Sequence, residues 1–141
     1  MHHIAILNPK WKLLEKIKSW EKTVESRWYK TKRNPWNNII AGDTVYFKDA
    51  WKKVVLMAQV TRVLQFEDFG EAEFNVIIEK YGKSIALLNT SYFPWYSSKR
   101  YCILVFLSDP QEIIPFDINK TWFWIWCAWI SIDDIDQIRI W

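Results

Sequence analysis

The order of apolar and polar positions predicts a strand and then a helix near the start of the chain. The apolar run 3–7 ends at Asn8-Pro9, which is typical of a short strand followed by a break. From Lys10 to Trp20, apolar residues recur mostly at helical spacing. We expect a helix there, with Asn8 as its N-cap and Pro9 at its first position.

Further along, β-branched and aromatic residues predict strands, and Gly, Pro and Asp residues predict the turns between them. We expect strands over residues 22–28, 44–48, 54–66 and 100–107. Residues 71–80 and 84–88 indicate two short helices, broken at Gly82. From Cys127 to Trp141 the pattern favours a strand, a turn at Asp133-Asp134, and a terminal strand or helix.

This pattern predicts one α+β domain over residues 1–141, built on a mixed β-barrel with flanking helices. The length of 141 residues fits one domain, and 50% hydrophobic residues can supply a core without staples. No internal repeat or linker divides the chain.

The many aromatic residues and the mild positive charge bear on whether the protein binds nucleic acid or forms a dimer. The chain holds 11 Trp, and its net charge of +3 allows nucleic-acid binding without requiring it. Trp122, Trp124 and Trp126 alternate as on one face of a strand, and Trp129 follows. We interpret this row as core or dimer packing rather than as a stacking platform for bases, and a homodimer formed through exposed aromatics is one expected partner.

Several classes of function find no support in the residues. Cys102 and Cys127 lie in apolar runs, so we interpret them as small buried hydrophobes in a reducing compartment. His2 and His3 lack the partners of a zinc site, and we expect no metal and no cofactor. The most apolar segment, 122–132, is short of the roughly 20 residues that span a bilayer, and no signal peptide is visible. We expect a soluble, cytoplasmic protein without a membrane partner.

The strongest chemical signal is the spacing K-x-x-E-x-R, formed by Lys22, Glu25 and Arg27 between a predicted helix and a predicted strand. Side chains at i and i+2 of a strand share a face, so Glu25 and Arg27 should point the same way. Lys22 joins them if a turn or bulge intervenes. Two cations around one carboxylate can bind a phosphate or a base edge, or serve acid–base chemistry. The alternative is a surface ion-pair network.

The motif resembles the signature G-x-K-x-x-E-x-R of the ASCH domain, a PUA-like fold; Trp20 stands at the glycine position. The Gly42-Asp43 turn before a strand and Val60-x-x-Val63 on a long β-ribbon also resemble the family. The stretch 114–120, with Ala128-Trp129-Ile130, is similar to archaeal and thermophile-type members. The resemblance covers most of the chain.

The resemblance implies RNA as the partner, or a nucleoside, bound in a cleft at the Lys22, Glu25 and Arg27 motif. Cations interleaved with aromatics extend this prediction, because cations contact phosphates while rings stack on bases. The expected RNA-binding residues beyond the motif are Lys30, Lys32, Arg33, Trp36, Lys48, Lys99 and Arg100. The alternative for each of these residues is a place in a solvated loop or turn without contact to RNA.

A second implication of the resemblance is hydrolysis, with Lys22 and Glu25 as catalytic residues. Some small ASCH proteins are amidohydrolases acting on N4-acetylcytidine, with a lysine and a threonine of the signature and a distant glutamate. Lys22 matches the lysine, but Glu25 stands where the threonine would be. The distant acid is open among Glu71, Glu73 and Glu79. Other members cleave RNA, for which Lys22 could stabilise the developing negative charge.

Overall fold

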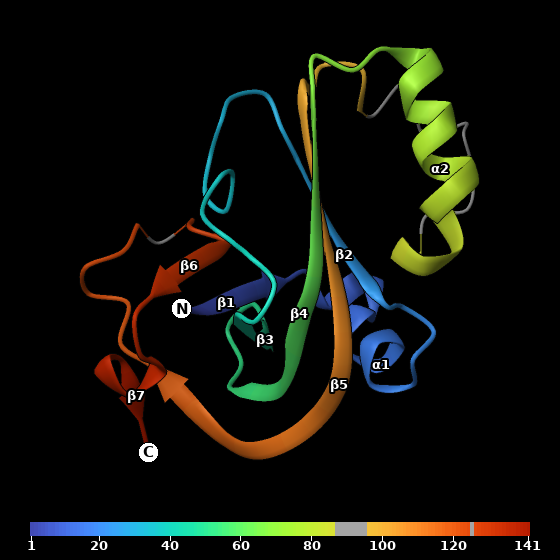
Figure 1. Ribbon diagram of the computed structural model, residues 1–141. Coiled ribbons are helices and arrows are strands. Elements are labelled where there is room, and N and C mark those ends of the chain that lie inside the picture. The colour runs from blue at the N-terminus through green and yellow to red at the C-terminus, as the bar shows by residue number, and fades with distance from the viewer. Residues whose placement is uncertain (87–95, 125) are drawn as a thin grey trace.

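A computed structural model describes residues 1–86, 96–124 and 126–141. The strands form a 7-stranded sheet in the order β2-β5-β4-β3-β1-β6, with β7 paired to β5 (Figure 1). These strands are β1 (His2–Leu7), β2 (Val24–Tyr29), β3 (Thr44–Asp49), β4 (Val54–Glu67), β5 (Tyr101–Ile118), β6 (Trp129–Ile132) and β7 (Arg139–Ile140). Among the described strands, β1 and β3 are the one parallel pair, so the sheet is mixed, as predicted.

The long hairpin of β4 and β5 curls the sheet. Its register shifts between Val54 and Leu56, between Met57 and Gln59, and again near Val60. Such bulges bend a strand and increase its twist, which turns a flat ribbon into part of a barrel. β5 runs on to Ile118 and is therefore far longer than the predicted 100–107 strand.

The helix expected over Lys10 to Trp20 is interrupted. A 3₁₀ turn η1 (Pro9–Trp11) precedes α1 (Leu13–Lys18), because Lys12 takes a left-handed φ of 54° that no helix continues through. The Asn8 cap is confirmed, since its side chain accepts from the Lys10 amide at 3.0 Å. Asn8 therefore caps η1 rather than one long helix.

The two short helices predicted at 71–80 and 84–88 are one helix, α2 (Glu71–Ile85), as far as the described residues run; residues 87 and 88 lie outside them. Gly82 is buried within α2. A glycine lowers helix stability by roughly 1 kcal/mol but does not end a helix whose apolar face is packed. Phe74, Ile77 and Ile78 supply that face.

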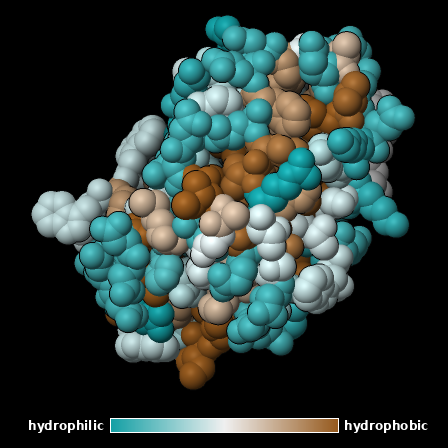
Figure 2. Space-filling model, viewed as in Figure 1, coloured by the Kyte–Doolittle hydropathy of each residue, from teal (hydrophilic) through white to brown (hydrophobic). Residues whose placement is uncertain are grey.

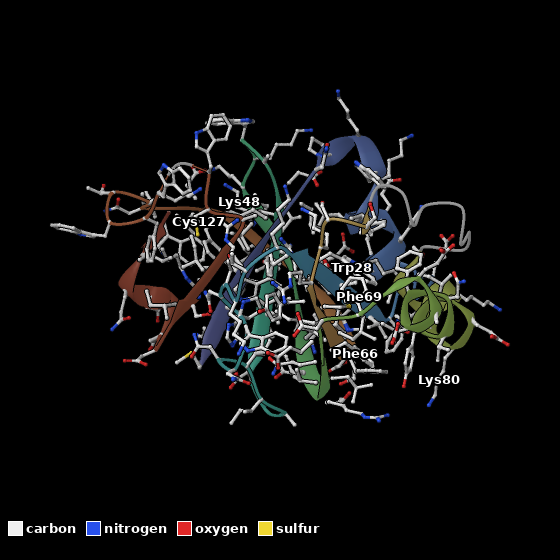
Figure 3. All side chains as sticks on the ribbon, turned by 90° about the horizontal axis from the view of Figure 1, so that it is seen from above. Trp28, Lys48, Phe66, Phe69, Lys80 and Cys127 are labelled. Atoms are coloured by element: carbon white, nitrogen blue, oxygen red, sulfur yellow. The ribbon has the colours of Figure 1, made fainter. Side chains whose placement is uncertain are left out.

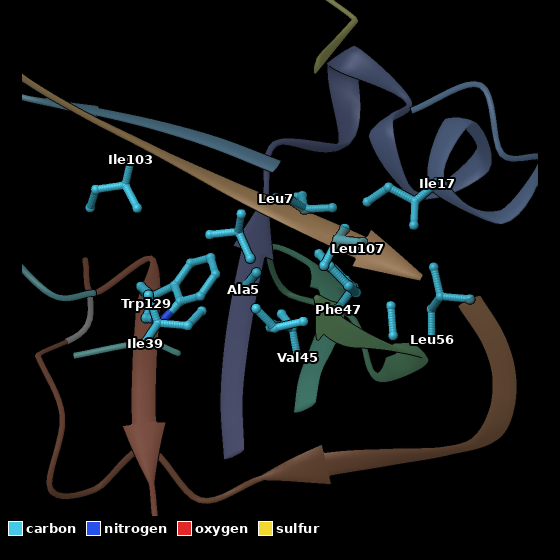
Figure 4. Packing of buried hydrophobic residues seen from close by; sticks show 13 residues of the cluster. Ala5, Leu7, Ile17, Ile39, Val45, Phe47, Leu56, Ile103, Leu107 and Trp129 are labelled. Carbon is cyan, nitrogen blue, oxygen red and sulfur yellow. The ribbon is translucent and has the colours of Figure 1, made fainter. Parts of the chain in front are cut away.

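Helices and loops cover the two faces of the sheet. α1 places Ile17 against Phe47 and Leu107 in the largest core cluster, which Trp129 closes (Figure 4). α2 packs on the other face, where Trp28 meets Phe69 edge-on at 5.4 Å between ring centroids (Figure 3). The space-filling view shows apolar side chains gathered near the middle of one face, with hydrophilic ones around them (Figure 2).

The end of the chain follows its predicted order. β6 is followed by a bend at 133–134, the 3₁₀ turn η3 (Ile135–Gln137) and β7. Trp122, Trp124 and Trp126 lie outside any strand and are 86%, 67% and 70% exposed, so core packing, one of their two predicted roles, is wrong. Packing in a dimer stays a prediction. Trp129, by contrast, is buried on β6.

Candidate functional site

The turn between α1 and β2 sets the position of the predicted motif. α1 ends where the Ser19 amide donates to the Glu15 carbonyl at 3.0 Å. Trp20 then takes a φ of 65°, in the region that glycine enters freely and other residues enter at a cost. Trp20 stands at the glycine position of the G-x-K-x-x-E-x-R spacing. The backbone there thus has a left-handed conformation that suits glycine. The Trp20 ring itself points outward and is 56% exposed.

Lys22 is a buried cation fixed by backbone oxygens. Its ammonium donates to the Val24 carbonyl at 2.9 Å and to the Ile85 carbonyl at 2.8 Å. The second bond ties the start of β2 to the last turn of α2. Burial lowers the pKa of Lys22, and Arg27 lowers it further, whereas the neighbouring Glu25 raises it.

Glu25 shares this buried site, and its Oε1 lies 3.8 Å from the Lys22 ammonium. The same oxygen accepts from the Ser26 amide at 3.0 Å. Its Oε2 is buried and has no hydrogen-bond partner among the residues that the structure describes. A buried, unpaired carboxylate oxygen is rare and unfavourable, so a hydrogen-bond donor that reached this atom would stabilise it.

Arg27 extends the row along the same face of β2, as the alternation predicted. Its guanidinium donates to the Ala128 carbonyl at 3.3 Å and to the Ile6 carbonyl at 3.4 Å, and it lies 5.0 Å from the Trp129 ring centroid. Its Nε is buried and has no hydrogen-bond partner in the described part of the chain. Arg27 therefore joins β2 to β1 and to the segment before β6. We call Lys22, Glu25 and Arg27 the β2 row.

Four of the predicted RNA-binding residues, Lys30, Lys32, Arg33 and Trp36, lie in the loop that follows β2. Lys30 and Arg33 are exposed, and the Arg33 guanidinium lies 5.5 Å from the Tyr29 ring. Lys32 pairs with Glu67 at 3.2 Å and lies 5.9 Å from the ring of Trp36, which is half-buried against the core. The loop thus presents cations beside rings, but part of its charge is neutralised.

Two other predicted residues lie beside this loop, because β2 and β5 are antiparallel neighbours. The Arg100 amide donates to the Tyr29 carbonyl at 2.8 Å, and its side chain pairs with Asp68. Lys99 precedes it and is half-buried. Tyr92, Phe93 and Trp95, which precede these two residues in the sequence, lie outside the described residues.

Lys48 lies apart from the β2 row, in the wall of a cavity of about 790 Å³. The cavity is formed by the end of β1, the turn between β3 and β4, and the stretches 119–124 and 126–128. Burial lowers the pKa of Lys48, and Lys120 nearby lowers it further, while Asp117 opposes them. Sequence reasoning had not joined Lys48 to Lys10 and Lys120, which lie far from it along the chain.

A second polar cluster escaped prediction. The fully buried His3 donates from Nε2 to Asp43 Oδ2 at 2.8 Å, and its Nδ1 accepts from the Trp129 indole at 3.1 Å. The Ser131 hydroxyl lies 2.7 Å from the same Nδ1. Because an indole can only donate, Nδ1 carries no proton and the imidazole is neutral. Burial lowers the pKa of His3, which agrees with the neutral form.

Asp43 is held ionised in this cluster. Burial alone would raise its pKa, but hydrogen bonds from His3, from the Ile40 amide and from the Met1 amino group lower it below its usual range. The cluster joins β1, β3 and β6. The signal that could have found it is the Gly42-Asp43 turn, where Gly42 has a φ of 96° and directs Asp43 back towards β1.

The three acids predicted as distant catalytic partners are exposed on α2. Lys22 binds the far end of this helix, at Ile85. Glu71 and Glu73 start the helix, roughly 20 Å along its axis from Ile85, and Glu79 is roughly 9 Å away. Glu73 instead caps the helix by accepting from the Gly70 amide at 2.9 Å.

Among the described residues, no group of His, Cys, Asp and Glu side chains is arranged to hold a metal ion. Cys102 and Cys127 are free thiols rather than a disulfide. In the part of the chain that the structure covers, no helix is long and apolar enough to cross a bilayer.

Comparison with known proteins identifies the fold. No family model and no curated protein matches the chain. The crystal structure of an ASCH protein from Zymomonas mobilis matches with a TM-score of 0.62 at 21% identity, over 82% of this chain and 73% of that one. Tyr-to-Phe and Ser-to-Ala mutants of the Zymomonas mobilis protein each match with a TM-score of 0.71 at 19% identity, over 96% of this chain and 93% and 91% of theirs. At these identities the likeness concerns the fold alone, which is the PUA-like α+β fold of ASCH proteins.

Proposed function

We propose that this chain is an ASCH-domain protein that binds single-stranded RNA, with the β2 row at the centre of the binding site. Its fold is that of ASCH proteins, and Lys22, Glu25 and Arg27 keep the spacing of their signature. The further resemblance of residues 114–120 to archaeal and thermophile-type members, and a cytoplasmic location, are parts of the same proposal.

The observation that carries the proposal is the buried Oε2 of Glu25, which has no hydrogen-bond partner among the described residues, on a carboxylate whose Oε1 lies 3.8 Å from the Lys22 ammonium. A carboxylate oxygen that lacks a donor matches the exocyclic amino group of cytosine, adenine or guanine, which can only donate. Arg27, two residues further along β2, has a buried Nε–H with no partner among the described residues, which matches a carbonyl or phosphate oxygen. The row can thus offer both a donor and an acceptor to one nucleotide.

The exposed cations at the end of β2 supply the charge that follows the RNA backbone. Lys30 and Arg33 are exposed and lie near Lys99 and Arg100 at the start of β5. Each phosphate contact releases counterions and adds about 0.7 to the slope of log K against log salt for a single strand. Trp36 and Tyr101, with ring centroids 5.2 Å apart, can support bases beside these cations.

The test is a titration of fluorescein-labelled single-stranded RNA, read by anisotropy at two salt concentrations. Wild type should bind with a salt-dependent affinity. Glu25→Gln should weaken binding roughly tenfold, because half of its acceptor capacity becomes a donor, with little change in the salt slope. Lys30→Ala should reduce the slope by about 0.7. Lys80→Ala, an exposed lysine on α2, is the control. Absence of binding by wild type at low salt would overturn the proposal.

Hydrolysis of RNA or of a modified nucleoside is the second candidate function. It is favoured by the lowered pKa of the buried Lys22, since a lysine that loses its proton more easily can act as a base. The Ser131 hydroxyl, 2.7 Å from a neutral imidazole that is itself bonded to Asp43, is a second arrangement suited to nucleophilic chemistry.

The two functions separate in one assay. Incubation with labelled RNA and with N4-acetylcytidine, followed by chromatography, should show unchanged material if the protein only binds. Turnover that Lys22→Met or Ser131→Ala abolishes in a protein that circular dichroism shows to be folded, while His2→Ala leaves it intact, would establish the hydrolase and identify which cluster acts.

A further inference from the structure

The cavity beside Lys48 combines features that neither the β2 row nor the core explains. Its volume of about 790 Å³ falls in the range of small-molecule sites, roughly 300–1,000 Å³. Three lysines and three aromatic residues from separate parts of the chain line it: Lys10, Lys48, Lys120, Trp51, Phe123 and Trp126. Lys48 and Cys127, both in its wall, lie on the same side of the molecule, away from Lys80 of α2 (Figure 3).

The lysines make this cavity attractive to an anion. Lys48 is half-buried, and among the described residues its ammonium makes no hydrogen bond or ion pair. The charge of Lys120 acts on it unfavourably, and Asp117, the nearest acid acting on it, is exposed and lies 4.0 Å from Lys53. Like charges brought together in a partly desolvated place are unfavourable, and a bound anion removes that repulsion.

The rings make the same cavity attractive to a flat, aromatic group. Trp51 and Trp126 line it and are 81% and 70% exposed, although a monomer gains nothing by exposing large apolar rings. Trp51 also takes a φ of 67°, a conformation that disfavours side chains other than glycine. Exposed indoles next to lysines suit a base that stacks while its phosphate meets an ammonium.

We propose that this cavity binds one nucleotide unit, a heteroaromatic base carrying a phosphate, with Trp51 and Trp126 against the base and Lys48 at the phosphate. The unit comes either from a free mononucleotide or from the phosphorylated end of an RNA strand. The proposal goes beyond RNA binding at the β2 row and does not rest on it. Arg27 connects the two, since the Ile6 and Ala128 carbonyls that it binds belong to residues of the cavity wall.

The test is isothermal titration calorimetry with adenosine 5′-monophosphate, adenosine and inorganic phosphate as separate probes. The monophosphate should bind roughly tenfold more tightly than adenosine, because one charge-assisted bond is added, and phosphate alone should bind weakly. Lys48→Met should lower the affinity for the monophosphate to that for adenosine. Trp51→Ala should weaken both, and Lys80→Ala should change neither.

Each remaining outcome decides the matter. Unchanged affinity in both Lys48→Met and Trp51→Ala, or no binding of the monophosphate at millimolar concentration, overturns the proposal. If Lys48→Met fails to fold, Lys10→Ala, at an exposed position, takes its place.

The source of the nucleotide is decided by two RNA 10-mers, one with a 5′-phosphate and one with a 5′-hydroxyl. Preference for the phosphorylated strand, lost in Lys48→Met, assigns the cavity to an RNA end; equal affinity leaves the free nucleotide as the ligand. Glu25→Gln should not change the affinity for the monophosphate. The experiments therefore distinguish a wrong proposal for nucleotide binding in the cavity from a wrong proposal for RNA binding at the β2 row.

Discussion

Replacing Lys22 with methionine tests whether the β2 row is a buried, bonded ion pair. The substitution keeps an unbranched side chain of nearly the same length and removes the ammonium, at a side chain that is 2% exposed. The carbonyls of Val24 and Ile85 then lose their donor, and Glu25 loses its nearest cation. We expect the free energy of unfolding to fall by about 3–5 kcal/mol, the loss typical of breaking a buried pair on one side.

Urea unfolding followed by circular dichroism measures this loss, with Lys30→Met as a matched control at an exposed lysine. The control should stay within about 0.5 kcal/mol of wild type. The double variant Lys22→Met/Glu25→Leu should lose less than the sum of its single variants, with a coupling of about 1–3 kcal/mol, because it leaves no unpaired carboxylate in the interior. A loss below about 1 kcal/mol for Lys22→Met, or additive behaviour of the pair, would refute the reasoning.

Three further outcomes follow from the structure. Because burial lowers the pKa of His3 below 6.5, the folded protein binds fewer protons than the unfolded chain on acidification. The free energy of unfolding should therefore fall between about pH 7 and pH 5, by at most roughly 2 kcal/mol. In urea titrations, His3→Gln should remove this pH dependence and His2→Gln should keep it. Trp20→Gly should raise the free energy of unfolding by about 0.5–1 kcal/mol, since φ is 65° there and the ring is exposed; a loss would show that the ring packs in solution. Phe74→Ala should cost about 3–5 kcal/mol in the same assay, because Phe74 is 0% exposed beneath α2; a cost near that of a surface substitution would place α2 elsewhere.

The sequence predicted the fold class and most elements because their signals are local. The apolar run of β1, the alternation in β4 and the Gly42-Asp43 turn do not depend on distant contacts, and all agree with the structure. The split at Lys12 and the continuity of α2 through Gly82 were missed, because tertiary packing decided them against local propensity. The length of β5 was missed for the same reason, since bulges hide its alternation.

The candidate site was partly predictable. Period-two alternation placed Glu25 and Arg27 on one face, and the turn at Trp20 brings Lys22 to them, as the motif required. The cavity around Lys48 and the bonds of His3 could not be foreseen, because they join residues more than a hundred positions apart in some cases. Spacing within a motif reports only what lies on one element.

The position of β1 in the sheet has a consequence for how the chain matures. β1 is flanked by β3 and by β6, whose residues Trp129–Ile132 are translated near the end of this sequence. Until then one edge of an apolar strand lies open, and His3 lacks the bond from the Trp129 indole. Open apolar edges recruit other chains. Nascent chains stalled before residue 129 should therefore depend on chaperones, and a deletion that removes β6 should yield aggregates rather than a smaller folded domain.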